Sequence, residues 1–151
     1  MIELPLFLCI KEQNMKILIL EDNLSRQEFF KVNLEKHNLT ITDLSKIAIE
    51  KLSTEKWDIL FLDHDLGGEV HVSSDNTNTG AEVARWIQNN PNKKPKLVII
   101  HTLNPPGQKY IKSCIPDGLV FPFAWTKINS EMLVDPRVIE VLKQKAYVQK
   151  I

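Results

Sequence analysis

The sequence predicts an α/β fold: one doubly wound, parallel sheet of five strands with helices on both of its faces. The main observation is that short, continuous apolar runs alternate with segments whose apolar residues have helical spacing. Apolar runs without polar alternation are typical of strands that are buried on both faces, as in parallel sheets. The second observation is the length of 151 residues, for which a single domain is the default.

Three apolar runs are the clearest strands, because each stops abruptly at polar residues: Lys16–Leu20, Ile59–Leu62 and Leu97–Ile100. Two weaker candidates, Thr40–Leu44 and Gly118–Phe121, complete the expected sheet. Helical segments lie between consecutive strands, and such crossover connections make neighbouring strands parallel. The order along the chain therefore predicts five parallel strands.

The segments between the strands carry signals for helix starts. Asn23 or Ser25 can cap a first helix, because a short side-chain oxygen accepts an unpaired backbone N–H there. Glu28, three residues after Ser25, fits a capping box. Thr79 can cap a later helix in the same way. We expect helices at residues 23–37, 45–56 and 80–90, a short one that begins at Pro105, and a last one at about 136–148.

Composition and charge exclude several classes of function. Lys and Arg number 19 and Asp and Glu number 19, so no basic excess points to duplex DNA, whose binding depends on phosphate neutralisation. No apolar run approaches the ~20 residues that span a bilayer. Cys9 and Cys114 lie far apart without metal-ligand spacing, which is typical of reduced thiols in the cytoplasm. We interpret residues 1–14 as an N-terminal extension of a domain at residues 15–151.

Three polar residues, Asp22, Asp63 and His101, each lie just after an expected strand. Ligands of open parallel sheets bind beyond the carboxyl ends of the strands, so we expect these side chains to line one crevice. Asp22 has an alternative role at the start of the following helix, where a negative charge is favourable. The long polar loop at residues 67–78 is either a substrate lid or an ordinary surface loop.

Asp63, His64 and Asp65 form the densest polar cluster of the chain. Two carboxylates beside an imidazole raise its pKa and fix its tautomer, which suits general acid–base catalysis. Together with Asp22, the same carboxylates can hold a divalent cation such as Mg or Mn. The alternative for the cluster is local capping and hydrogen bonding within a loop.

A second imidazole, His101, ends the next expected strand, and Thr102 and Asn104 follow it. Two histidines on either side of one phosphorus can act as base and acid in turn. We therefore assign His64 and His101 as the acid–base pair of a phosphoesterase, without deciding which is which. Asn104 and Thr102 are expected to contact the phosphate.

The order of these residues resembles the receiver fold of response regulators. Those proteins have acidic residues after strand one, a phosphoacceptor Asp after strand three, a Thr or Ser after strand four and a Lys after strand five. Glu21, Asp22 and Asp63 match the first two positions. His101 replaces the hydroxyl residue, and no lysine stands within 120–123, so the pattern argues against ordinary phosphorelay signalling.

The departures are similar to those of the cyclic-phosphate processing receiver domains, a divergent group of receivers. The matching motifs are Asp22, Asp63-His64-Asp65, His101-x-x-Asn104 and Thr79-Gly80. The resemblance covers residues 15–123 and implies receiver (flavodoxin-like) topology. It also implies a hydrolase that acts on 2′,3′-cyclic phosphate ends of RNA or on cyclic nucleotides, and it adds Thr79 to the expected substrate contacts.

Two alternatives to this two-histidine hydrolase stay open. One is a metal-dependent phosphoesterase that holds its cation through Asp22, Asp63 and His101. The other is a degenerate receiver that signals or binds a nucleotide without turnover. Under the leading hypothesis no cofactor is required, and the partner is a nucleotide or RNA end with a cyclic phosphate rather than duplex DNA or a membrane. The sequence predicts no particular oligomeric state.

Overall fold

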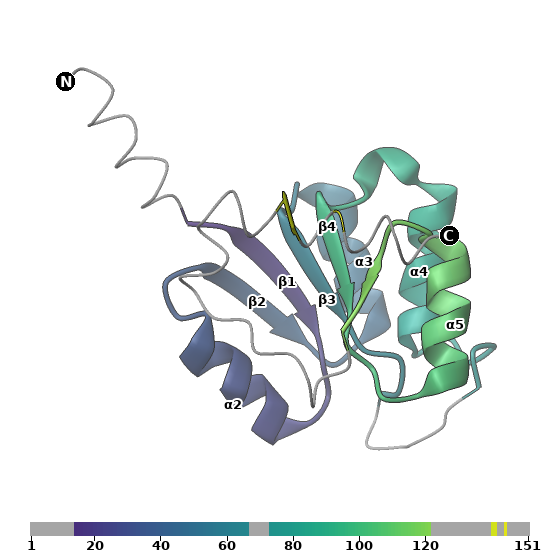
Figure 1. Ribbon diagram of the computed structural model, residues 1–151, viewed down its shortest axis with the longest axis horizontal. Coiled ribbons are helices and arrows are strands. Elements are labelled where there is room, and N and C mark those ends of the chain that lie inside the picture. The colour runs from purple at the N-terminus through teal and green to yellow at the C-terminus, as the bar shows by residue number, and fades with distance from the viewer. Residues whose placement is uncertain (1–13, 67–72, 122–139, 142–143, 145–151) are drawn as a thin grey trace.

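The computed structural model of the chain describes residues 14–66, 73–121, 140–141 and 144. Its centre is a sheet of five parallel strands in the order β2-β1-β3-β4-β5 (Figure 1). The strands are β1 (Lys16–Leu20), β2 (Asn38–Thr42), β3 (Ile59–Leu62), β4 (Leu97–Ile100) and β5 (Leu119–Val120). The predicted doubly wound parallel sheet is therefore confirmed. The proposed N-terminal extension and most of the helix expected at 136–148 lie outside the described residues.

Four α-helices connect the strands: α2 (Leu24–Asn33), α3 (Ser45–Thr54), α4 (Gly80–Asn89) and α5 (Pro105–Cys114). A short 3₁₀ helix, η1 (Pro91–Lys93), follows α4. Asn23 caps α2, Thr79 caps α4 and Asn104 caps α5, each by accepting a backbone N–H from the first turn of its helix. Within the described part of the chain, the helices are too short or too polar to cross a bilayer.

The first helix is capped by Asn23, one of its two predicted caps, but ends earlier than predicted. Ser25 lies inside α2 rather than at its cap, so the expected capping box with Glu28 is wrong. The helix ends at Asn33 instead of about His37. The reason is that the chain turns at residues 34–37 to enter β2, where His37 Nδ1 accepts the backbone N–H of Met15 at 3.0 Å.

Buried apolar side chains form two clusters, one on each face of the sheet. The cluster on one face contains side chains of α3, α4 and α5, for example Leu52, Val83 and Ile111. The cluster on the other face contains Phe30 of α2 and Leu34 just after it. Figure 1 shows α2 set apart from α3 and α4 across the sheet. We call these two sides of the sheet the α3–α5 face and the α2 face.

The alternation along β3 determines which way the following residues point. Leu60 and Leu62 belong to the cluster on the α3–α5 face, whereas Ile59 and Phe61 belong to that on the α2 face. Successive side chains of an extended chain point to opposite faces. The two residues after the strand should therefore diverge, the first toward the α2 face and the second toward the α3–α5 face.

Candidate functional site

Three buried polar side chains meet on the α2 face at the carboxyl ends of the strands. Glu21 follows β1, Asp63 follows β3 and His101 follows β4, and these three strands are neighbours in the sheet. One carboxylate or imidazole atom of each residue lies within 4.8 Å of the others. Their exposed fractions are 0%, 4% and 1%, so the cluster is almost completely removed from water. We call it the Glu21–Asp63–His101 cluster.

Glu21 is the acceptor at the centre of this cluster. His101 Nε2 lies 3.0 Å from Glu21 Oε1, and Arg26 donates to both carboxylate oxygens, through Nε at 2.7 Å and Nη2 at 3.0 Å. The backbone N–H of Asn23 adds a further bond to Oε2 at 3.0 Å. Burial alone would raise the pKa of Glu21, but the hydrogen bonds from His101 and Arg26 outweigh it and hold this pKa well below its ordinary value. Glu21 is therefore ionised at neutral pH.

The carboxyl of Asp63 has a different environment from that of Glu21. Its Oδ1 accepts the backbone N–H of His64 at 2.8 Å, whereas its buried Oδ2 has no hydrogen-bond partner among the described residues. Among the described residues, Arg26 forms the ion pair with this oxygen, with Nη2 3.7 Å from Oδ2. Burial raises the pKa of Asp63 to about 7, with a further contribution from the negative charge of Glu21, while His101 and Arg26 oppose the rise. A carboxyl with this pKa can accept or donate a proton at neutral pH.

The ring of His101 is held from two sides. Its centroid lies 5.4 Å from that of Phe30 and 6.3 Å from that of Phe61, in edge-on geometry in both cases. Because the ionised Glu21 can only accept, His101 Nε2 carries a hydrogen and donates it. The result is an imidazole with a fixed tautomer and a fixed orientation at the cluster.

His64 lies on the opposite face of the sheet. Its Nδ1 is 2.8 Å from Asp65 Oδ1, and its Nε2 is 3.0 Å from Ser74 Oγ. Asn104 Nδ2 donates to the same Asp65 oxygen at 3.0 Å, and Asn104 Oδ1 caps α5 by accepting the N–H of Gly107. A Cβ atom at Gly107 would stand 2.5 Å from His64 Cγ, so the ring packs directly on the α5 backbone. His64 thus joins the end of β3 to the start of α5.

The structure corrects the expectation that the two imidazoles share one cleft. His101 packs on Phe30 of α2, whereas His64 packs on Gly107 of α5. Both rings are buried, with exposed fractions of 1% and 0%. The physical reason is the alternation of side chains: Asp63 and His101 each occupy the first position after a strand, and His64 occupies the second. The imidazole that was expected opposite His101 is therefore replaced there by the carboxyl of Asp63.

The other residues that were predicted to contact substrate lie near the Glu21–Asp63–His101 cluster or near His64. Asp22 is partly exposed beside Arg26. Hydrogen bonds to Glu21 raise the pKa of that guanidinium against the lowering effect of burial, and the charges of Glu21, Asp63 and, least, Asp22 add to the rise. Thr102 is buried, and its Oγ1 accepts the N–H of Asn104 at 3.1 Å. The hydroxyl of Thr79 is also buried and serves the cap of α4. The structure thus uses both threonine hydroxyls in local hydrogen bonds.

Sequence reasoning gave little weight to Glu21 and Arg26 and missed Ser74. A signal for Glu21 was present, because it continues the alternate positions 17 and 19 of β1, which face α2. Arg26 carries a weaker signal, its place one turn into α2 after the acidic pair. No pattern in the sequence indicated that Ser74, ten residues away, contacts His64.

A family model, that of the cyclic-phosphate processing receiver domain, matches residues 16–117. This match covers the Glu21–Asp63–His101 cluster, His64 and its contacts, and more than half of the chain. The chain belongs to the cyclic-phosphate processing receiver domains. Receiver-like identity, predicted from the motifs after the strands, is therefore confirmed. No curated protein sequence matches the chain.

Several solved structures similar to this receiver domain are receivers of signalling proteins. The receiver domain of a putative LuxO repressor protein from Vibrio parahaemolyticus is 19% identical, with a TM-score of 0.57, over 91% of this chain and 95% of that one. A CheY-like receiver from Methanospirillum hungatei is 15% identical, with a TM-score of 0.60, over 88% and 97%. CheY4 from Vibrio cholerae is 14% identical, also with a TM-score of 0.60, over 86% and 99%. At these identities the likeness shows the shared fold.

The donor atoms of the cluster in this receiver domain suit a divalent cation by type but not by their present bonding. Two carboxylates and an imidazole are common metal ligands. Both oxygens of Glu21, however, already accept hydrogen bonds from Arg26, and His101 Nε2 is directed at Glu21. Among the carboxylate oxygens of the cluster, Asp63 Oδ2 is the one without a hydrogen-bond partner in the described part of the chain. A cation does not fit this arrangement while Arg26 stays in place.

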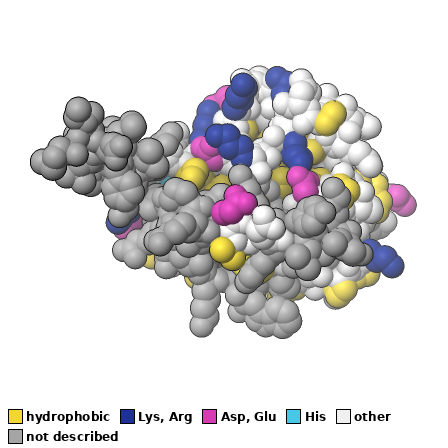
Figure 2. Space-filling model, turned by 45° about the horizontal axis from the view of Figure 1, so that its top comes forward, with side chains coloured by type: hydrophobic (Ala, Val, Ile, Leu, Met, Phe, Trp, Pro, Cys, Tyr) yellow, Lys and Arg dark blue, Asp and Glu magenta, His cyan; other side chains and the backbone are white. Residues whose placement is uncertain are grey.

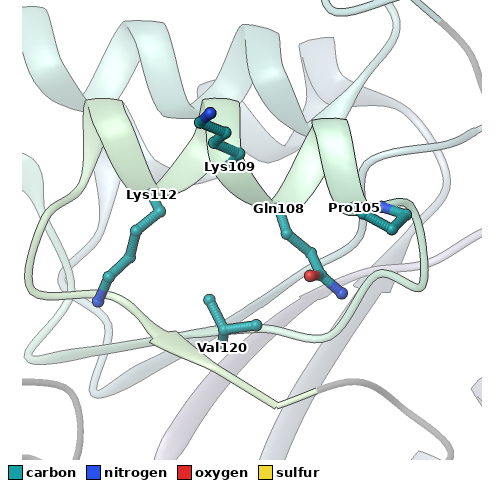
Figure 3. A pocket seen from close by; sticks show the side chains of 5 residues that line it. All are labelled: Pro105, Gln108, Lys109, Lys112 and Val120. Carbon is teal, nitrogen blue, oxygen red and sulfur yellow. The ribbon is translucent and has the colours of Figure 1, made fainter. Parts of the chain in front are cut away.

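A shallow groove of about 300 Å³ lies beside the start of α5. Its walls are Pro105, Gln108, Lys109 and Lys112 of α5 and Val120 of β5. Figure 3 shows Gln108 and Lys112 extending from α5 on either side of Val120. Gln108 Nε2 donates to the carbonyl of Thr102 at 2.6 Å, so a hydrogen bond joins the groove to the loop that follows His101.

On the face shown in Figure 2, acidic and basic side chains are mixed, without a wide basic surface.

Proposed function

We propose that this receiver domain is a phosphoesterase that hydrolyses a cyclic phosphate, with Asp63 and His101 as its proton-transfer pair. The observation that carries the proposal is the buried Oδ2 of Asp63, a carboxyl oxygen without a hydrogen-bond partner among the described residues. It belongs to the same 4.8 Å cluster as His101. The family description, cyclic-phosphate processing, supports the class of substrate.

The reaction requires one proton to be accepted and one to be delivered. The oxygen of a water molecule bonds to phosphorus, and the bond from phosphorus to one ribose oxygen breaks. A base takes a proton from the water, and an acid protonates the departing ribose oxygen, which leaves a phosphomonoester and a hydroxyl. Asp63 suits the role of base once ionised, since its pKa of about 7 matches a neutral working pH. His101 beside the ionised Glu21 suits the role of acid.

We assign His64 and Asp65 a positioning role in place of the acid–base role expected from the sequence. The backbone N–H of His64 orients Asp63 Oδ1, and its ring is fixed by Asp65 and Ser74. Since Glu21, Asp63 and His101 are almost fully buried, substrate contact requires the margin of the cluster to open. Asp22 and Arg26 are the partly exposed residues at that margin.

The other expected substrate contacts stay predictions. They are Asp22, Thr79, Thr102 and Asn104. The divalent cation, Mg or Mn, that was expected through Asp22 and Asp63 has no part in this proposal, because both oxygens of Glu21 accept hydrogen bonds from Arg26, which also lies beside Asp63. The proposed partner is a nucleotide or an RNA end with a cyclic phosphate, and the balance of 19 basic and 19 acidic residues does not favour duplex DNA.

The experiment measures hydrolysis of 2′,3′-cyclic nucleotides, cyclic-ended RNA and cyclic dinucleotides, with and without a chelator, with product analysis. Asp63→Asn and His101→Gln should each lower turnover at least about a hundredfold, because one positioned acid or base contributes 10²–10⁴-fold. Asp117→Asn is the matched control, since Asp117 is an exposed carboxylate just before β5, at the other end of the strands. Full activity of Asp63→Asn would remove Asp63 from the mechanism.

A second candidate is a receiver that signals or binds a nucleotide without turnover. It is favoured by several solved structures of similar fold that are receivers of signalling proteins, and by the position of Asp63 after β3. This candidate predicts that a small phosphodonor labels Asp63 and that no cyclic substrate is converted. Labelling that survives in Asp63→Asn, or turnover in the wild type, would count against it.

A further inference from the structure

The guanidinium of Arg26 already supplies a positive charge to the Glu21–Asp63–His101 cluster. Its Nε and Nη2 lie 2.7 Å and 3.0 Å from the two oxygens of Glu21, and Nη2 lies 3.7 Å from Asp63 Oδ2. One cation therefore interacts with both carboxylates. A divalent ion bound by the same oxygens would have to lie within a few ångströms of this guanidinium, where like charges repel.

The local fold keeps Arg26 in this position. The backbone N–H of Arg26 donates to Asn23 Oδ1 at 3.0 Å, which caps α2, and the N–H of Asn23 donates to Glu21 Oε2. Gln27 Nε2 donates to the carbonyl of Glu21 at 2.7 Å. The first turn of α2 is thus built around Glu21, and the bidentate contact of Arg26 is part of that turn rather than a chance surface pair.

We propose that Arg26 is the permanent cation of this cluster, that it takes the place of a divalent metal ion in the native chain, and that its removal uncovers a divalent-cation site formed by Glu21, Asp63 and His101. The buried, unbonded Asp63 Oδ2 is the oxygen that a metal ion would use once the guanidinium is gone. This inference goes beyond the proposed hydrolysis and does not depend on it.

Manganese binding to the full chain, without any substrate, tests the proposal. Mn²⁺ titrations followed by electron paramagnetic resonance would compare the wild type with Arg26→Gln and Arg26→Lys. We expect Arg26→Gln to bind one Mn²⁺ at least about 100-fold more tightly than the wild type, because a neighbouring positive charge is lost. Arg26→Lys keeps the charge and should stay as weak as the wild type.

Two controls identify the site. Adding Asp63→Asn to Arg26→Gln should abolish the new Mn²⁺ binding. Arg85→Gln removes another arginine that contacts a carboxylate, that of Glu82, and should gain no affinity. Stoichiometric Mn²⁺ binding to the wild type that Asp63→Asn abolishes would overturn the proposal even if Arg26→Gln failed to fold. Equal Mn²⁺ affinities of the wild type and a folded Arg26→Gln would also overturn it.

Discussion

Replacing Asp63 by asparagine should make the folded chain more stable at alkaline pH. The folded state raises the pKa of Asp63 from its ordinary value of 3.8 to about 7, mainly through burial. Between these two values the folded state keeps a proton that the unfolded chain has released. The free energy of unfolding therefore falls as pH rises through this window, and the loss is complete above about pH 7.

The size of this effect follows from the same two values. Each pKa unit corresponds to about 1.4 kcal/mol, so the rise from 3.8 to about 7 corresponds to up to about 4 kcal/mol. The side-chain amide that replaces the carboxyl in Asp63→Asn does not titrate. We therefore expect this variant to approach the wild type in stability near pH 4 and to exceed it by up to about 4 kcal/mol at pH 8.

Urea unfolding at a series of pH values between 4 and 8 measures the difference directly. Asp117→Asn, which removes an exposed carboxyl paired with Lys94, is the control variant. A stability difference between Asp63→Asn and the wild type that does not change with pH would refute the reasoning. A gain in stability together with lost turnover would show that the cluster is kept for chemistry at the expense of stability.

Three further predictions test the surroundings of the cluster. Gly107→Ala should destabilise the fold by about 1–3 kcal/mol, because the added Cβ would lie 2.5 Å from His64 Cγ. The loss should become smaller without vanishing in a His64→Ala background, which keeps the His64 Cβ at 2.9 Å, and a double-mutant cycle measures the difference. Ser74→Ala, which removes the partner of His64 Nε2, should lower stability by about 1 kcal/mol in urea unfolding, and an unchanged midpoint would contradict it. Lys109 in the α5 groove is predicted to bind the additional backbone phosphates of an RNA substrate. Lys109→Gln should therefore lower kcat/KM a few-fold for cyclic-ended RNA at low salt and leave kcat/KM for cyclic mononucleotides unchanged. Equal losses of kcat/KM on both substrates would rule out this role.

The sheet could be predicted from the sequence because its signal is local. The runs that form β1, β3 and β4 are continuous and apolar, and each ends at the predicted residue. The cap of α4 by Thr79 was equally clear, since a single side chain determines it. The end of α2 could not be predicted, because the hydrogen bond between His37 and Met15 joins residues that are 22 positions apart in the sequence.

The candidate site could be predicted only in part. Burial of Asp63 and His101 at one edge of the sheet follows from their positions just after two strands that prove to be neighbours. That the side chain of His64 points away from that of Asp63 could be predicted from the alternation along β3, because adjacent residues of an extended chain face opposite sides of the sheet. The contacts of Arg26 were not readable, since a long side chain can reach several partners and only the packed structure selects one.

The core cluster on the α2 face draws its helical side chains, within the described residues, from a single ten-residue helix. Within the described residues, local opening of this one short helix would expose Glu21, Asp63 and His101 to protons and ligands without unfolding the whole domain. Leu24 and Val32 on that helix are exposed and lie outside the cluster. Substitutions there could change how often the site opens while leaving every reacting group in place.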